Sequence, residues 1–224
     1  ALYPHMVELC TLQDRKNLAS VYHRGAQLVT VLTTPVLMLL VFFAEGVLYM
    51  WSGDPGLAKN TAPILSVLVI GTFLNGLMYL PYHLQIAHGW TGLTIKTNIV
   101  AVIVIIPAIF WMVPRYGGLG AAWVWVTLNL GYILISIHFM HRRLLAEEKW
   151  RWYSADVLFP VAGAITVNLF AMQLQPANFQ YRSHWFIFLL LTGILSLASS
   201  AVLANRIRPY LTTITGRLLK GQFP

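Results

Sequence analysis

Long apolar runs alternate with short polar connectors along the whole chain. Each run approaches the roughly 20 residues that a helix needs to cross about 30 Å of hydrocarbon. The six runs cover residues 26–50, 62–84, 92–113, 118–140, 155–174 and 184–204. The pattern predicts an all-α fold, a polytopic membrane bundle of six transmembrane helices.

The polar segments predict how the chain is divided. Residues 1–25 alternate charged and apolar side chains at nearly helical spacing. They are expected to form an amphipathic elbow along the cytoplasmic surface, in which Asp14 caps a helix that starts at Arg15. The remaining parts are a four-helix transmembrane unit at 26–145, a cytoplasmic loop at 146–153, a terminal transmembrane hairpin at 154–205 and a basic cytoplasmic tail at 206–224.

Composition agrees with a membrane protein. The chain is 58% hydrophobic and 10% charged, with a mean hydropathy of +0.67, whereas soluble domains are about 25% charged. Its net charge of +8 does not indicate nucleic acid, because the basic residues lie between the apolar runs instead of clustering on one exposed face. The single cysteine, Cys10, excludes an internal disulfide. The expected surroundings are membrane lipid.

Lysine and arginine are divided unequally between alternate connectors. Three of them, Lys59, Arg115 and Arg182, fall on one predicted side. The other twelve fall on the opposite side: Arg15, Lys16, Arg24, Lys96, Arg142, Arg143, Lys149, Arg151, Arg206, Arg208, Arg217 and Lys220. By the positive-inside rule the richer side is cytoplasmic, so both chain ends are predicted to be cytoplasmic.

Small residues predict where helices approach one another, because close approach in lipid depends on them. Ser196, Ser200 and Ala204 form a stripe on the last run, and Gly71 and Gly76 give the second run a thin side.

Candidate substrate contacts collect in residues 81–98, where polar groups lie between two apolar runs. The cation Lys96 either extends its stem to the membrane surface or faces an anionic substrate. His83 and His88 are either interfacial histidines or groups lining a cavity. Together with Asn98 these are the predicted substrate-binding residues.

Other ionisable residues give weaker signals. Glu45 is a candidate for proton coupling, although its position near the end of a run favours a residue close to water. Asp156 is expected to lie in the first turn of a helix, where a carboxylate is favourable. His138 and His141 have same-face spacing, but adjacent arginines would repel a metal. We therefore predict no metal, no cofactor and no catalytic residues, since no acids or Ser/His/Asp sets cluster.

Three segments carry a resemblance to a known family. LYPHMVEL near the start, LPYHLQIAHGWTGL and YGGLGAAWVWVTLNLGY occur in an order and spacing that resembles the O-antigen type polysaccharide flippases of the multidrug/oligosaccharidyl-lipid/polysaccharide exporter superfamily. The resemblance covers about residues 1–145. The glycines at 117, 118 and 120 suit a tight outer turn.

The resemblance implies a MATE-like transporter, not an enzyme, in the bacterial inner membrane. It would flip a polyprenyl-diphosphate-linked glycan between leaflets for polysaccharide biosynthesis, as a C-terminal portion that works with an N-terminal lobe of a longer chain. In such relatives the last two spans form a lateral groove for a lipid tail. The alternatives are a drug or small-molecule antiporter of the same superfamily, and a membrane enzyme or subunit of polysaccharide assembly.

Overall fold

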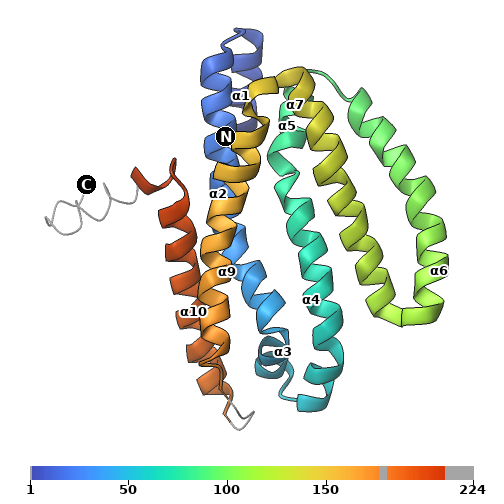
Figure 1. Cartoon of the computed structure of the whole chain (residues 1–224), viewed down its shortest axis with the longest axis vertical. Helices are drawn as coiled ribbons and strands as arrows, with labels where there is room; N and C mark the ends of the chain where they lie inside the picture. The colour runs from blue at the N-terminus through green and yellow to red at the C-terminus, as the bar shows by residue number, and fades with distance from the viewer. Residues whose placement is uncertain (1, 177–180, 210–224) are drawn as a thin grey trace, which may run out of the picture.

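Within residues 2–176 and 181–209, which the computed structural model describes, the chain is helical and has no strand. The helices are α1 (Leu2–Thr11), α2 (Arg15–Phe42), α3 (Ala44–Ser52), α4 (Pro55–Leu77), α5 (Tyr79–Ala87), α6 (Gly92–Gly131), the π-helical turn η1 (Tyr132–Ser136), α7 (Ile137–Leu144), the 3₁₀ turn η2 (Ala146–Glu148), α8 (Lys149–Arg151), the π-helical turn η3 (Trp152–Leu158), α9 (Phe159–Met172) and α10 (Arg182–Leu203) (Figure 1). Most of the predicted tail at 206–224 lies outside the described residues.

Five helical segments in the described part are long and apolar enough to cross a membrane. They are Arg15–Phe42, Pro55–Ala87, Gly92–Leu144, Ala146–Met172 and Arg182–Leu203. The chain is therefore a multi-pass helical membrane protein.

The third segment, Gly92–Leu144, is folded back on itself. Its 53 residues would extend about 80 Å as one straight helix, far more than a bilayer core. Gly117 has non-helical angles, φ 57° and ψ −139°, a conformation that glycine adopts readily. Figure 1 shows two arms side by side, residues 92–116 (the first arm) and residues 118–144 (the second arm), which contain the runs at 92–113 and 118–140.

The N-terminal region differs from the expected elbow. Asp14 does cap α2, and its carboxylate accepts from the backbone N–H of Asn17 at 3.1 Å. The helix that starts there runs without interruption past residue 25. Tyr22 and His23 in its first half are fully buried, so this amphipathic face packs against protein. The first predicted run, 26–50, is divided by a break at Phe43 between α2 and α3.

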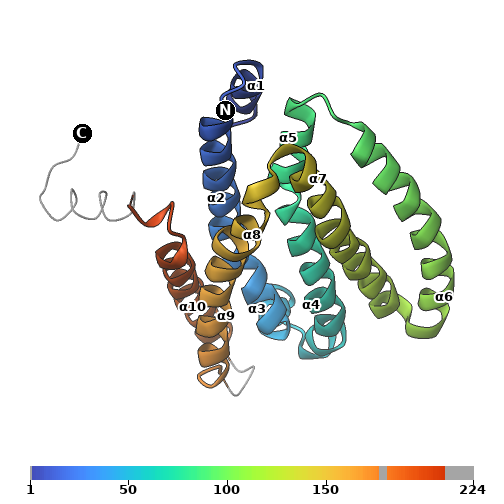
Figure 2. The same cartoon turned by 45° about the horizontal axis from the view of Figure 1, so that its top comes forward.

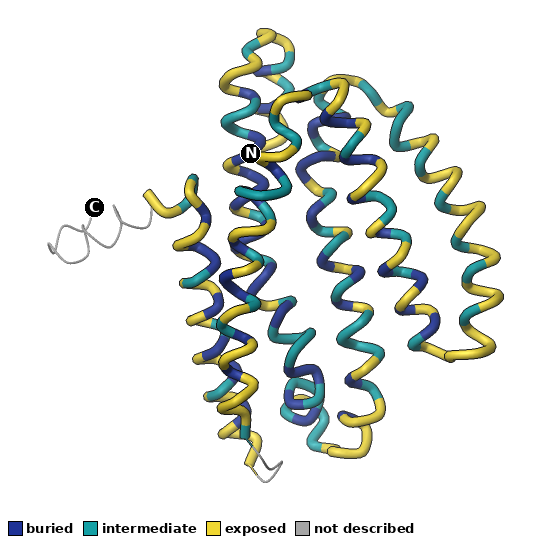
Figure 3. The backbone as a smooth tube through the Cα atoms, in the orientation of Figure 1, coloured by how far each residue is buried: buried dark blue, intermediate teal, exposed yellow. Residues whose placement is uncertain are grey.

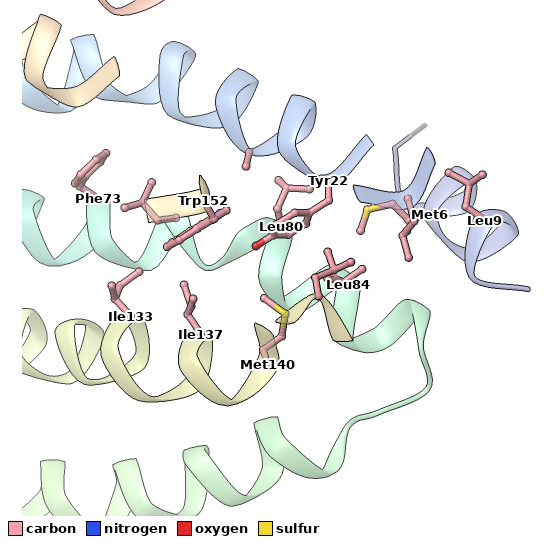
Figure 4. Close-up of a cluster of buried hydrophobic side chains, with 14 of the residues drawn as sticks. Met6, Leu9, Tyr22, Phe73, Leu80, Leu84, Ile133, Ile137, Met140 and Trp152 are labelled. Atoms are coloured by element: carbon pink, nitrogen blue, oxygen red, sulfur yellow. The ribbon is translucent and has the colours of Figure 1, made fainter. Parts of the chain in front are cut away.

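The largest apolar cluster lies at the end of the molecule where α1, α5 and α7 meet (Figure 4). It joins side chains from α2, α5, α7 and η3, including Tyr22, Leu84, Ile137 and Trp152. Helices far apart in the sequence are thereby held together at this end.

Small residues make the predicted close contacts. Ser196, Ser200 and Ala204 are fully buried. A Cβ added at Gly71 would lie 2.4 Å from Cδ1 of Trp125, which places the second arm directly on α4. The first arm lies at the edge of the molecule (Figure 2), and the tube in Figure 3 is mostly exposed there.

Candidate functional site

Two cavities meet at the first arm of α6. One, which we call the apolar groove, lies between the two arms and has a volume of about 550 Å³. Aliphatic and aromatic side chains dominate its walls, among them Val100, Val104 and Trp111 on the first arm and Leu128 and Phe139 on the second. Such a groove suits an apolar chain or ring.

The other, which we call the polar cavity, has a volume of about 340 Å³ and lies among α4, α5, the first arm and η1. Amide and hydroxyl groups contribute much of its lining: Asn75, Gln85, Thr94, Thr97, Asn98, Tyr132 and Ser136. Gly76 also lines it, and a Cβ added there would meet no atom within 4 Å. The thin side predicted for this helix therefore borders open space at Gly76, whereas at Gly71 it contacts the second arm.

Hydrogen bonds fix the polar groups of this cavity in place. Thr94 Oγ1 donates to Gln85 Oε1 at 3.0 Å, and the Tyr132 hydroxyl donates to Asn98 Oδ1 at 2.8 Å. Asn75 Nδ2 donates to the fully buried Asn129 Oδ1 at 2.9 Å. Buried Ser136 Oγ has no hydrogen-bond partner among the described residues.

The two cavities share a wall and differ in polarity. Thr97, Tyr132 and Ser136 line both of them. Among the described lining residues of either cavity, Lys96 is the one charged side chain. A neutral set of amides and hydroxyls can exchange hydrogen bonds with a hydroxyl-rich ligand without titrating. The geometry therefore fits an amphiphile that is apolar in one part and rich in hydroxyl groups in another.

The predicted substrate residues are only partly brought together. Lys96 is exposed and lines the apolar groove, and Asn98 lines the adjoining polar cavity. Neither His83 nor His88 lines the apolar groove or the polar cavity. Glu45 lies half-buried in the first turn of α3, away from both cavities.

The two histidines have other neighbours. His83 Nδ1 lies 2.8 Å from the carbonyl oxygen of Tyr79, and its ring packs against that of Tyr79 at 4.2 Å between centroids. His88 Nδ1 lies 2.9 Å from the Leu84 carbonyl and 3.5 Å from Cys10 Sγ. Burial raises the pKa of the Cys10 thiol, so it remains protonated at neutral pH.

Sequence reasoning missed most of the polar cavity. Asn75 and Asn129 lie within apolar runs, where an amide is costly unless it has a partner or a function. That cost was the available signal, but it does not show that Asn75 lines a cavity or that it bonds Asn129.

A second polar group, which we call the ionisable cluster, consists of His23, Glu148 and Asp156. His23 Nδ1 bonds Asp156, and His23 Nε2 lies 2.8 Å from Glu148 Oε2. Asp156 lies in η3 and is fully buried, so the expectation of a simple helix-start carboxylate was wrong. Gln27, one turn beyond His23, donates to Asp156 Oδ1 at 2.9 Å and to Asn205 Oδ1 at 2.7 Å.

Fold and site together define a helical membrane protein with an amphipathic pair of cavities. The chain is similar to the "Putative O-antigen transporter" of Shigella flexneri, with 28% identity over 125 residues. That match covers 56% of this chain and 29% of the relative, so the chain spans under a third of the relative's length. No family model and no solved structure matches the chain.

Proposed function

We propose that the chain is part of a transporter that flips a lipid-linked oligosaccharide across the bacterial inner membrane for surface polysaccharide biosynthesis. The observation that carries the proposal is the shared wall between the apolar groove and the polar cavity. The name of the Shigella relative supports it. In this proposal the described helices make six crossings, with the α6 arms counted separately, and both chain ends are cytoplasmic.

The proposed mechanism involves no bond chemistry. Sugar hydroxyls would exchange hydrogen bonds with Asn98, Gln85 and Ser136, while apolar parts of the cargo occupy the groove or the surrounding lipid. Desolvating a diphosphate in hydrocarbon is costly, and Lys96 would lower that cost by facing the anion. An N-terminal lobe of a MATE-like transporter would complete the path along the exposed face of the first arm.

We propose a different position for the apolar part of the cargo from the one that the resemblance implied. The expected lipid groove belonged to the last two spans, but α9 and α10 are closely packed through Asn168 and Ser196, whose side chains bond at 3.2 Å. We therefore assign the apolar part of the cargo to the α6 hairpin.

The proposal is tested by removing one amide from the polar cavity of the native full-length protein. We expect Asn98→Leu to reduce flipping of a lipid-linked oligosaccharide in proteoliposomes about fivefold, because a lost hydrogen bond costs about 1 kcal/mol. The matched control is Asn60→Leu, an exposed asparagine on α4 outside both cavities. Equal flipping by both variants would reject the cavity as the glycan site.

A second variant examines the cation. Lys96→Ala should lose polysaccharide export in cells while the protein remains in the membrane, as measured by immunoblotting of membrane fractions. Normal export by this variant would reject the diphosphate contact and leave the glycan test unaffected.

A further inference from the structure

The ionisable cluster places a buried imidazole between two carboxylates of different exposure. The His23 side chain is 0% exposed, that of Asp156 1% and that of Glu148 26%. Each ring nitrogen faces a carboxylate oxygen. The cluster therefore connects a fully buried acid, through one ring, to an acid that water can reach.

This geometry determines how many protons the cluster holds. A neutral imidazole has one N–H donor and one lone pair, and a carboxylate has only lone pairs. Each of the two hydrogen bonds needs one proton between the ring nitrogen and the carboxylate that it faces. Both bonds therefore exist only if both ring nitrogens are protonated, or if one ring nitrogen and the carboxyl group that faces the other nitrogen are protonated. Either arrangement holds two protons. Loss of one proton would set a ring lone pair against a carboxylate, which breaks one of the two bonds.

The bonds of the cluster hold three segments together. His23 is on α2, Glu148 on η2 and Asp156 on η3. Gln27 extends the network, because its Oε1 accepts from the backbone N–H of Arg206 at 2.8 Å. The residues that follow α10 are thereby joined to α2 through Gln27, whereas a broken bond at His23 weakens the attachment of α2 to η2 or to η3.

Charged and titratable groups surround the cluster on the neighbouring elements. They are Tyr22 on α2, His141 on α7, Lys149 and Arg151 on α8, Tyr153 on η3 and Arg206 after α10. Arg151 Nη1 lies 3.6 Å from Glu148 Oε2.

We propose that His23, Glu148 and Asp156 form a proton-binding site that locks α2 to η2 and η3 while it holds two protons. Release of one proton, to water through the partly exposed Glu148, frees these elements to separate. The site would give a transporter a place where proton movement is linked to helix movement. It does not rest on the proposed cargo, and its failure would leave the glycan proposal intact.

The test measures the separation of α2 from η3 as a function of pH. In the native full-length protein with Cys10→Ser, spin labels are placed at Leu28→Cys and Leu158→Cys, which are 46% and 58% exposed. The distance between the two spin labels is measured by double electron–electron resonance in lipid nanodiscs. The measurement is made at about pH 6 and at about pH 9, on either side of the range in which an ordinary imidazole titrates. We expect a single distance at the lower pH and a second, longer one at the higher pH, reversible on return.

Variants identify the titrating groups. In Glu148→Gln/Asp156→Asn the amides can donate to and accept from a neutral imidazole, so we expect the shorter distance at both pH values. The single Glu148→Gln change, at the partly exposed position, replaces the double variant if that one does not fold. The control is His5→Asn/Glu8→Gln, which removes an exposed His–Glu pair at 3.2 Å and should keep the wild-type response. A wild-type distance that does not change with pH, or a change that persists in the amide variant, would overturn the proposal.

Discussion

Gly46 on α3 lies directly against the indole ring of Trp185 on α10. A Cβ added at Gly46 would be 2.1 Å from Cζ3 of that ring. The ring is held in place, because it is 4% exposed and packs edge-on against Phe188. We expect Gly46→Ala to lower the free energy of unfolding by about 1–3 kcal/mol, the usual cost of overpacking, as measured by thermal unfolding in detergent.

Gly131 offers a matched control at the same scale. Its backbone is helical, and an added Cβ would meet nothing within 4 Å. Alanine is favoured over glycine in a helix by up to about 1 kcal/mol, so Gly131→Ala should be as stable as wild type or more so. An equal loss of stability in both variants would contradict the packing explanation.

Asp14 makes the start of α2 sensitive to acid. Hydrogen bonds from the Asn17 backbone N–H and then its side chain lower the pKa of Asp14 below its ordinary 3.8. The stabilisation is therefore complete above the ordinary pKa and is lost as the pH falls through the lower folded value. We expect the hydrogen-exchange protection of the first turn of α2 to be complete above the ordinary pKa of Asp14 and to fall as the pH decreases through its lower folded value. Asp14→Ala should lack this protection at neutral pH, and normal protection there would refute the cap.

Single residues show what the sequence can and cannot predict. The Asp14 cap was predictable because both partners are three positions apart and the rule is local. His23 and Asp156 are 133 positions apart, and each taken alone looks like a polar residue near a helix end. Only the packing of α2 against η3 brings them together, so local patterns could not find the ionisable cluster.

At the scale of elements, α9 and α10 depend on small side chains. Ser196 is fully buried and accepts from Asn168 Nδ2, and Ser199 Oγ donates to the Gly163 carbonyl at 3.1 Å. We expect Ser196→Leu to separate the helices and to lower stability by about 1–3 kcal/mol, measured as faster hydrogen exchange in α10. Ser183→Leu, at an exposed position in the first turn of α10, should exchange at the wild-type rate. Slower or unchanged exchange in Ser196→Leu would contradict this contact.

Two element boundaries escaped prediction for different reasons. The amphipathic spacing of residues 15–25 has the same period whether a helix lies on a membrane or packs against protein. In this chain the helix packs against protein. The break at Phe43 has no glycine or proline to mark it. Phe43 is 2% exposed and packs edge-on against Phe188 at 5.1 Å, so tertiary contacts favour the break. The turn at Gly117, by contrast, was predictable from its glycines.

At the scale of the whole molecule, the fold gathers the connectors between helices at two opposite ends. Figure 1 shows α1, α5 and α7 at one end, and α3 with the turn between the α6 arms at the other. An added Cβ at Gly53 would lie 1.4 Å from Nη2 of Arg182, which places the start of α10 beside the connection between α3 and α4. The connection between α3 and α4, the turn between the α6 arms and the start of α10 were predicted to share one side. They lie at the same end of the molecule, although each helix was predicted separately.

This arrangement predicts which residues face the cell exterior. In a Cys10→Ser background, an impermeant maleimide applied to intact cells should label Lys59→Cys and Tyr116→Cys, and should label Glu147→Cys only after the membrane is opened. All three positions are exposed. Labelling at 116 is the critical measurement, because the second arm returns the chain to the starting side only if Gly117 turns it at the far membrane surface. Labelling of Glu147→Cys as readily as Lys59→Cys would invalidate the six crossings, and with them the path proposed for the cargo.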